Sequence, residues 1–177
     1  MTAIVVAGAA AAAMLFYAPR KVSSLRAEDC ESLLFYDGQC CLCHAFVAFA
    51  LAHESSNRVK FGAIQEHGDL MRKIGAGAFA EGGDQHLRSV VLVQNGKVFV
   101  RSDAALRVIA LFDAPYKYIA VAHALPIGAR DAGYKLVAKW RYRLFGHTDV
   151  VTHPPAHYSD RFITKDDLAS KSSSQKK

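Results

Sequence analysis

The sequence predicts an α/β protein with a mixed sheet and helices on its faces. Three observations support this prediction. Short apolar stretches rich in β-branched and aromatic residues alternate with stretches of helical periodicity, an Asn-Gly pair separates two of the apolar stretches, and 177 residues are enough for one domain with a sizeable core. We expect the order β-α-β-α-β-β-α, followed by further helices.

The first two strands are expected to be parallel because a helix joins them. Leu33–Tyr36 is apolar and aromatic, as in a buried strand, and an Asp-Gly turn follows it. From Cys43 to about Glu54, apolar residues recur near the 3.6-residue period of a helix. Arg58–Gln65 alternates apolar with other residues and predicts the second strand.

The next two strands form the clearest local signal. After a short helix over Glu66–Ile74 and a Gly-rich loop, the strands Ser89–Gln94 and Lys97–Arg101 are separated only by Asn95-Gly96. A tight type I′ turn needs positive φ at both central residues, which favours Asn-Gly. An antiparallel hairpin is therefore expected.

Three helical regions follow the hairpin. The first is expected to be capped by Ser102 or Asp103 and to turn Ala110, among others, inward. The second is Tyr116–Ala124, and the third begins at Pro126 and stops at Gly146. In the third, apolar residues recur at helical spacing; they are Leu136, Val137, Trp140 and Leu144. We interpret Trp140 as a packing residue. The order of elements matches the thioredoxin-like fold, with additional C-terminal helices.

The N-terminal residues 1–27 form a hydrophobic leader, with no charged side chain before Arg20. A spanning helix needs about 20 apolar residues, so this Ala-rich run is of borderline length and only weakly hydrophobic. We expect an N-terminal hydrophobic helix that associates with a membrane through residues 1–18. Arg20, Lys21 and Arg26 would then keep the domain on the cytosolic or matrix side. A cleaved targeting peptide of a mitochondrion or plastid and a frayed helix are the alternatives.

The domain is expected over 32–146, and 147–177 forms a C-terminal extension that is disordered at its end.

The formal net charge is +6, and several of the basic residues lie near the two ends of the chain. The middle contains no basic block with interleaved aromatic residues, so nucleic acid is not an expected partner.

The chain has four cysteines, and three of them fall within residues 40–43. A disulfide framework would spread its cysteines along the chain, so this cluster indicates chemistry or metal binding.

Cys40 and Cys43 form a C-x-x-C motif between a predicted strand and a predicted helix. The free N–H groups and the dipole at a helix N-terminus favour a thiolate. We expect Cys40 to be the more exposed cysteine and to attack a disulfide, and Cys43 to resolve the mixed disulfide. This chemistry requires no metal and no organic cofactor.

Three alternatives compete with redox chemistry. Cys40, Cys43 and His44 also spell the C-x-x-C-H motif of c-type haem attachment. A zinc site would need further ligands, for which Cys30 and the pair His153 and His157 are the candidates. Cysteine and histidine are suitable zinc ligands, but the spacing of these residues is only weak evidence for a zinc site. In the third alternative, the cysteines are small buried hydrophobic residues.

The segment Tyr36–Cys43 resembles the DCC family of thiol–disulfide oxidoreductases, whose Asp-x-x-Cys-x-x-Cys signature is matched by Asp37, Cys40 and Cys43. The stretches Ser102–Phe112 and Ala129–Gly146 are similar to later parts of the family, so the resemblance covers about residues 32–146. It implies a thioredoxin-like fold, a disulfide reductase or exchange activity, and Cys40 and Cys43 as the redox pair.

The resemblance also makes Asp37 the acidic signature residue. It could accept a proton from the resolving thiol, as a buried carboxylate can, or be an ordinary turn residue. For Arg141 and Tyr142 we favour a structural role over binding of an anionic partner. Two departures stand out. Cys41 replaces the Pro or Asn of many relatives, which makes it a candidate for an alternative pair or for a third reactive thiol. Residues 85–88 lack the cis-proline that thioredoxins place before the hairpin.

The predicted function is thiol–disulfide exchange on protein or small-thiol disulfide substrates, with electrons from an unidentified reductase or from glutathione. The alternative is a non-catalytic, membrane-associated interaction module whose cysteines bind zinc or sense oxidation. The predicted location is a membrane, facing the cytosol or matrix, or an organelle.

Overall fold

The computed structural model describes residues 20–21, 32–77, 89–148 and 156–163. The predicted leader apart from residues 20 and 21, the approach to the hairpin at 85–88, most of the Gly-rich loop and the end of the chain lie outside the described residues. Within the described ranges, none of the helices combines the length and the hydrophobicity needed to cross a membrane.

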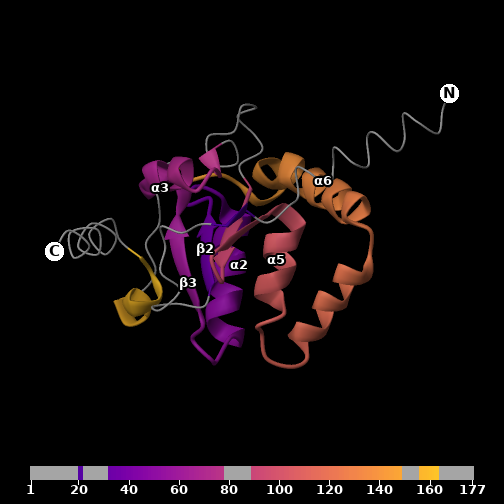
Figure 1. Cartoon of the computed structure of the whole chain (residues 1–177), viewed down its shortest axis with the longest axis horizontal. Coiled ribbons are helices and arrows are strands. Elements are labelled where there is room, and N and C mark those ends of the chain that lie inside the picture. Colours follow the sequence, from indigo (N-terminus) through magenta and orange to yellow (C-terminus); the bar gives the residue numbers. More distant parts are fainter. Residues whose placement is uncertain (1–19, 22–31, 78–88, 149–155, 164–177) are drawn as a thin grey trace.

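Five strands form one mixed sheet in the order β1-β5-β4-β2-β3 (Figure 1). The strands are β1 (Arg20–Lys21), β2 (Ser32–Tyr36), β3 (Val59–Ala63), β4 (Val91–Gln94) and β5 (Lys97–Val100). The α-helices are α2 (Cys41–His53), α3 (Gly68–Lys73), α5 (Arg101–Ile109) and α6 (Ile127–Phe145). The 3-10 helices are η1 (Ile64–Glu66), η2 (Tyr116–Ala124) and η3 (Ala156–Arg161).

The strand pairing has the predicted directions. β2 and β3 are parallel, with Leu34 opposite Phe61, whereas β4 is antiparallel to both β2 and β5. The hairpin turn has φ values of 50° at Asn95 and 68° at Gly96, as a type I′ turn requires. The mixed α/β class, the parallel pair and the hairpin are therefore confirmed. The two-residue strand β1 at the edge of the sheet was not predicted.

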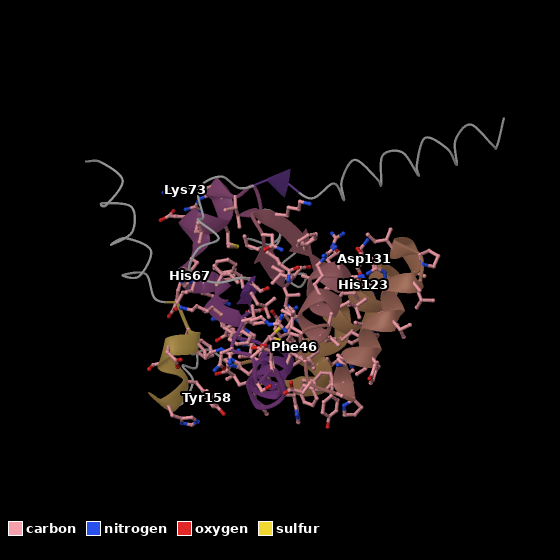
Figure 2. All side chains as sticks on the ribbon, turned by 60° about the horizontal axis from the view of Figure 1, so that its bottom comes forward. Phe46, His67, Lys73, His123, Asp131 and Tyr158 are labelled. Carbon is pink, nitrogen blue, oxygen red and sulfur yellow. The ribbon has the colours of Figure 1, made fainter. Side chains whose placement is uncertain are left out.

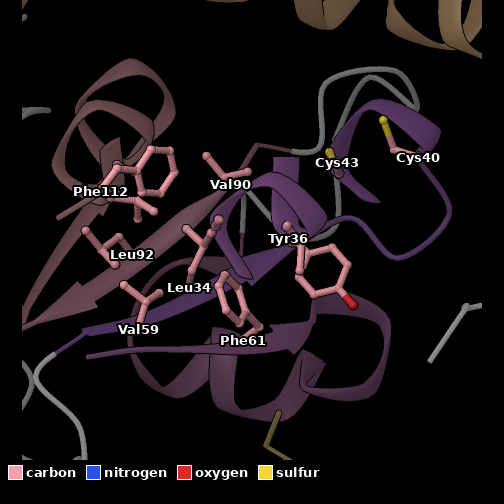
Figure 3. Packing of buried hydrophobic residues seen from close by; sticks show 13 residues of the cluster. Leu34, Tyr36, Cys40, Cys43, Val59, Phe61, Val90, Leu92 and Phe112 are labelled. Atoms are coloured by element: carbon pink, nitrogen blue, oxygen red, sulfur yellow. The ribbon is translucent and has the colours of Figure 1, made fainter. Parts of the chain in front are cut away.

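Both faces of the sheet are buried, because alternate residues of a strand point to opposite sides. Leu34 of β2 and Leu92 of β4 belong to a core cluster with α2 and α5. Their neighbours Phe35 and Val91 belong to a second cluster, which includes Met71 of α3. Figure 3 shows the first cluster, which extends to the two cysteines at the start of α2. Helices on both faces of a mixed sheet are consistent with the thioredoxin-like fold.

Helix α5 begins without the predicted side-chain cap. Ser102 lies inside the helix and is buried, and its hydroxyl donates to the carboxylate of Asp131 on α6. The buried face of α5 consequently carries Ser102, Ala104 and Val108. The prediction that Ala110 points inward is wrong, since this residue is exposed.

Helix α6 turns its predicted apolar stripe toward solvent. Leu136, Trp140 and Leu144 are 61%, 38% and 69% exposed, so the interpretation of Trp140 as a packing residue is wrong. The face that packs against α2 and α5 instead carries the buried polar residues Asp131 and Arg141. Their hydrogen-bond partners lie on α5 and just before α2, so polar pairing rather than hydrophobicity orients this helix.

Part of the predicted C-terminal extension packs onto the outer edge of the sheet. The Ile163 N–H donates to the Phe61 carbonyl of β3 at 2.9 Å. The guanidinium of Arg161 lies 2.6 Å from the carboxylate of Glu54, and both groups are buried. In Figure 2, η3 with Tyr158 lies on the opposite side of the molecule from η2 and the start of α6.

Candidate functional site

The turn between β2 and α2 brings the predicted residues Asp37, Cys40 and Cys43 together. The Cys40 N–H donates to the Asp37 backbone carbonyl at 3.2 Å, which closes the turn. Cys40 keeps an extended backbone, and its carbonyl accepts from the His44 N–H at 3.0 Å as α2 begins. The C-x-x-C motif therefore lies at the predicted junction between a strand and a helix.

The thiols of Cys40 and Cys43 interact directly and unequally. A hydrogen bond from the Cys43 thiol to the Cys40 sulfur is the largest cause that lowers the pKa of Cys40 to about 6. Burial opposes this shift, whereas the Cys43 backbone N–H and the charge of Arg141 support it. The same thiol hydrogen bond, together with burial, raises the pKa of Cys43 well above its ordinary value. At neutral pH the pair therefore consists of a thiolate at Cys40 and a protonated thiol at Cys43.

The prediction that Cys40 is the more exposed cysteine is wrong. Cys40 is 0% and Cys43 is 7% exposed. The segment that follows α6 returns to this turn, where His147 pairs with Cys40 in an isolated antiparallel bridge. The Thr148 N–H also donates to the Gln39 carbonyl at 3.0 Å. Gly146 indicates that the helix ends, but it does not indicate where the chain goes next. The pairing of this segment with the turn at Cys40 was therefore not predicted from the sequence.

Gly146 allows the chain to turn back, because its φ of 89° lies in the left-handed region that favours glycine. It also lies against Cys41, whose Sγ would be 3.7 Å from a Cβ built at this position. Cys41 is partly exposed and is not bridged to another cysteine. Its role as a third reactive thiol stays a prediction, and Cys30 lies outside the described residues.

The Asp37 side chain is buried and accepts hydrogen bonds from four groups of the described chain. Its Oδ1 accepts from the Gln39 N–H at 3.1 Å and from the Gln65 amide at 2.6 Å. Its Oδ2 accepts from the Arg141 guanidinium at 3.0 Å and from the Tyr142 hydroxyl. Burial alone would raise the pKa of Asp37, but the hydrogen bonds and the charge of Arg141 outweigh it and lower this pKa.

Arg141 and Tyr142 tie helix α6 to this carboxylate. Arg141 is 3% exposed, and its Nη2 also lies 2.8 Å from the Tyr142 hydroxyl. Burial and the hydrogen bond to Asp37 raise the pKa of Tyr142 to about 12, so the hydroxyl keeps its proton and remains a donor. These contacts support the structural role favoured for both residues. The proton-acceptor role of Asp37 stays a prediction, and its low pKa and four donors favour an anchoring role.

Sequence reasoning missed Gln65, although a signal for it exists. β2 and β3 are parallel with Tyr36 opposite Ala63, so residues that follow the two strands meet at one edge of the sheet. The Gln65 side chain accepts from the Gly38 N–H at 3.0 Å while it donates to Asp37. It thereby fixes Asp37 and Gly38 at the start of the turn that carries the cysteines.

Tyr134 of α6 is a second residue that sequence reasoning missed. Its hydroxyl accepts from the Val90 N–H at 3.1 Å, just before β4. Burial is the main cause that raises the pKa of Tyr134 to about 12, and the negative charge of Cys43 when ionised acts in the same direction. The backbone N–H at the start of the hairpin, near the thiols, is thus hydrogen-bonded to a side chain of α6.

His44, the candidate haem-motif residue, is held within the domain. Its ring nitrogen Nε2 lies 2.8 Å from the Gly38 carbonyl, and its ring packs edge-on against Tyr36. Of the candidate zinc ligands, His153 lies outside the described residues. In the part of the chain that the structure describes, no group of three or more His, Cys, Asp or Glu side chains is arranged to hold a metal ion.

We predict that Cys43→Ala raises the pKa of Cys40 from about 6 toward the ordinary thiol value, because it removes the thiol that donates to the Cys40 sulfur. The ultraviolet absorbance of the thiolate, measured across pH and corrected with the Cys40→Ser protein, reports this shift. Cys41→Ala is the control and should titrate like the parent. An unchanged titration of Cys43→Ala would contradict the assigned hydrogen bond.

We predict that Asp37→Asn lowers the free energy of unfolding by about 3–5 kcal/mol, because it leaves the Arg141 charge buried without its counter-ion. The pKa of Asp37 is lowered on folding, so its contribution is complete above the ordinary value of 3.8 and is lost as the pH falls below it. Urea denaturation across pH should therefore show a loss in acid for the parent and a flatter profile for the variant. Asp69→Asn, which removes an exposed partner of Arg72, should change little.

The chain is similar to two known proteins over most of its length. It is 30% identical over 131 residues to a chloroplastic DCC family protein of Arabidopsis thaliana, which covers 73% of this chain and 74% of the relative. It is 29% identical over 133 residues to protein YuxK of Bacillus subtilis, which covers 74% of this chain and 93% of the relative. No solved structure matches the chain. The DCC1-like thiol-disulfide oxidoreductase family model matches residues 34–147, and the chain belongs to this family.

Proposed function

We propose that the protein catalyses thiol–disulfide exchange through Cys40 and Cys43, on protein or small-thiol disulfides. The observation that supports this most directly is the placement of Cys40 and Cys43 at the N-terminal end of α2, together with the interaction with Cys43 that lowers the pKa of Cys40 to about 6. It divides the two tasks of a reductase between the two cysteines, because one sulfur is ionised at neutral pH and the other keeps its proton.

The reaction begins when the Cys40 thiolate attacks one sulfur of a substrate disulfide. The substrate S–S bond breaks, a mixed disulfide with Cys40 forms, and the first substrate sulfur leaves as a thiolate that takes up a proton. Cys43 then loses its proton and attacks the Cys40 sulfur, which releases the second substrate thiol and leaves a Cys40–Cys43 disulfide. Two electrons pass to the substrate, and a small thiol such as glutathione or a dithiol reductase restores the pair.

Asp37, Arg141 and Tyr142 support this reaction as positioning residues. The carboxylate fixes the turn before Cys40 and holds the guanidinium of Arg141 in the buried site. The charge of Arg141 favours a thiolate at either cysteine, whereas the charge of Asp37 opposes it. The fixed positive charge thus offsets the cost of placing a thiolate beside a carboxylate in a buried site.

Cys40 must become accessible before it can attack, because it is fully buried and the segment with His147 and Thr148 is paired with the turn that carries it. We include in the proposal a local opening of this segment. The opening breaks the hydrogen bond from the Thr148 N–H to the Gln39 carbonyl and the bridge between His147 and Cys40, while the sheet and α2 keep their packing.

We predict that Cys40→Ser abolishes reduction of a disulfide substrate such as insulin, with a small dithiol as the electron source, because it removes the attacking sulfur. Cys43→Ser should lose steady-state turnover and accumulate mixed disulfides on Cys40, whereas Cys41→Ser should keep most of the activity. Mass spectrometry of the trapped species identifies the attacking sulfur. Parental turnover in Cys40→Ser would overturn the proposal.

We predict that Thr148→Pro speeds alkylation of Cys40 by iodoacetamide roughly fivefold at a fixed pH, because proline lacks the N–H that holds the segment after α6 to the turn, and a lost hydrogen bond weakens this pairing by about 1 kcal/mol. Thr148→Ser keeps the N–H and should react like the parent. Peptide mapping separates Cys40 from Cys41. Equal rates in all three proteins would show that this segment does not limit access.

A further inference from the structure

Exposed apolar side chains are concentrated in one part of the molecule. Ten large hydrophobic residues are exposed in the described part of the chain, and nine of them lie from Tyr118 to Phe145, on η2, on α6 and at Leu125 between them. Soluble monomers rarely gather so many on adjoining elements without using them to bind something. The tenth, Phe49, is instead packed against Phe112 and Tyr116.

Helix α6 has a buried inner face and an exposed apolar outer face. The inner face packs against α2 and α5 and carries the buried Asp131, Ala138 and Arg141. The opposite side carries Leu136, Val137, Trp140 and Leu144, which we call the outer stripe. Residues four apart lie above one another on a helix, so the outer stripe is continuous along the second half of α6. Each of its side chains is at least 38% exposed.

A row of exposed basic residues borders the outer stripe. Lys135, Lys139 and Arg143 are spaced four apart and fall between the inner face and the stripe. From residue 114 to residue 145, apart from the buried residues Asp131 and Arg141, the sequence contains five Lys or Arg residues and no acidic residue. Asp131 is buried against Ser102 and Arg101, so it does not offset the basic row at the surface.

We propose that the outer stripe of α6 docks on a membrane surface that contains anionic lipids. An interfacial helix has this composition: Leu, Val and Trp on the apolar side, with Lys and Arg beside it. The tryptophan ring is favoured at the boundary between acyl chains and headgroups, and the long basic side chains reach the headgroups. The inner face remains on the domain, so α6 lies on the bilayer and does not cross it.

The same observations argue against a protein partner on the stripe. Lysine is depleted in protein interfaces, whereas two of the three residues in the basic row are lysines. A second copy that docked on the same stripe about a two-fold axis would bring two basic rows together, and like charges would repel. An anionic bilayer surface matches both features, because its acyl region accepts the apolar stripe and its headgroups pair with the basic row.

Trp140 provides a direct test, because it is the single tryptophan of the chain and lies on the stripe. The full-length protein is mixed with phosphatidylcholine vesicles, with or without phosphatidylglycerol, that carry brominated acyl chains. We expect the emission of Trp140 to shift to the blue and to be quenched by the anionic vesicles, and much less by the neutral ones. Leu136→Ser with Leu144→Ser should remove the quenching.

Matched charge variants test the basic row. Lys135→Gln with Lys139→Gln should raise the lipid concentration for half-maximal quenching roughly 30-fold. Lys73→Gln with Lys97→Gln removes the same charge from exposed positions on α3 and β5 and should leave it unchanged; Figure 2 shows Lys73 far from the start of α6.

Three results would overturn the proposal. The first is a chain that sediments with anionic vesicles while Trp140 remains unquenched, since another segment would then hold it. The second is equal lipid dependence for both pairs of lysine variants. The third is a blue shift that grows with protein concentration in the absence of lipid, which would assign the stripe to a second copy of the chain.

Discussion

One buried carboxylate holds the architecture of the site together. Asp37 receives a backbone donor from its own turn, a side-chain donor from η1, which follows β3, and two donors from α6. Without it, the turn before the cysteines, the parallel strand pair and the last long helix would have no shared polar contact. A buried ion pair adds little net stability compared with apolar packing, but it specifies which groups meet. Its value here lies in geometry, because it sets where the helix with Arg141 lies relative to the thiols.

The electrostatics of the thiols follow from that geometry. A thiolate beside a buried carboxylate is unfavourable, and Asp37 does act to raise the pKa of both Cys40 and Cys43. Two features reverse the balance for Cys40 alone. The Cys43 thiol donates directly to its sulfur, and the guanidinium that Asp37 itself holds in place favours the ionised form. The asymmetry between the two sulfurs therefore depends on their hydrogen bond more than on the field around them.

Local patterns in the sequence predicted the strands, the hairpin and the helix boundaries well, because these depend on neighbouring residues. Asn95 and Gly96 determine their turn, and Gly146 ends α6 as expected. The sequence also placed Cys40 and Cys43 at the junction of a strand and a helix. The orientation of α6 was not predictable from its apolar period, because Asp131 and Arg141 found buried partners and turned the apolar stripe outward.

The pairing of the segment after α6 with the turn at Cys40 was also not predictable, since it joins two residues about one hundred positions apart, Cys40 and His147. Gln65 could have been found, because the parallel register of β2 and β3 brings its position next to Asp37. Contacts that follow from strand register are thus accessible to sequence reasoning. Contacts made by a returning loop are not, because no local pattern specifies where a chain goes after a helix ends.

The burial of Asp131 and Arg141 on one side of α6 has a consequence for how this helix can change in evolution. Each residue of an α-helix turns the chain by about 100°, so inserting or deleting one residue between these two positions would rotate one anchor out of the interior. A substitution on the outer side of α6 changes one contact at a time, whereas a change in length would separate Asp131 or Arg141 from its buried partner. The spacing of this helix is therefore constrained independently of what its outer side binds.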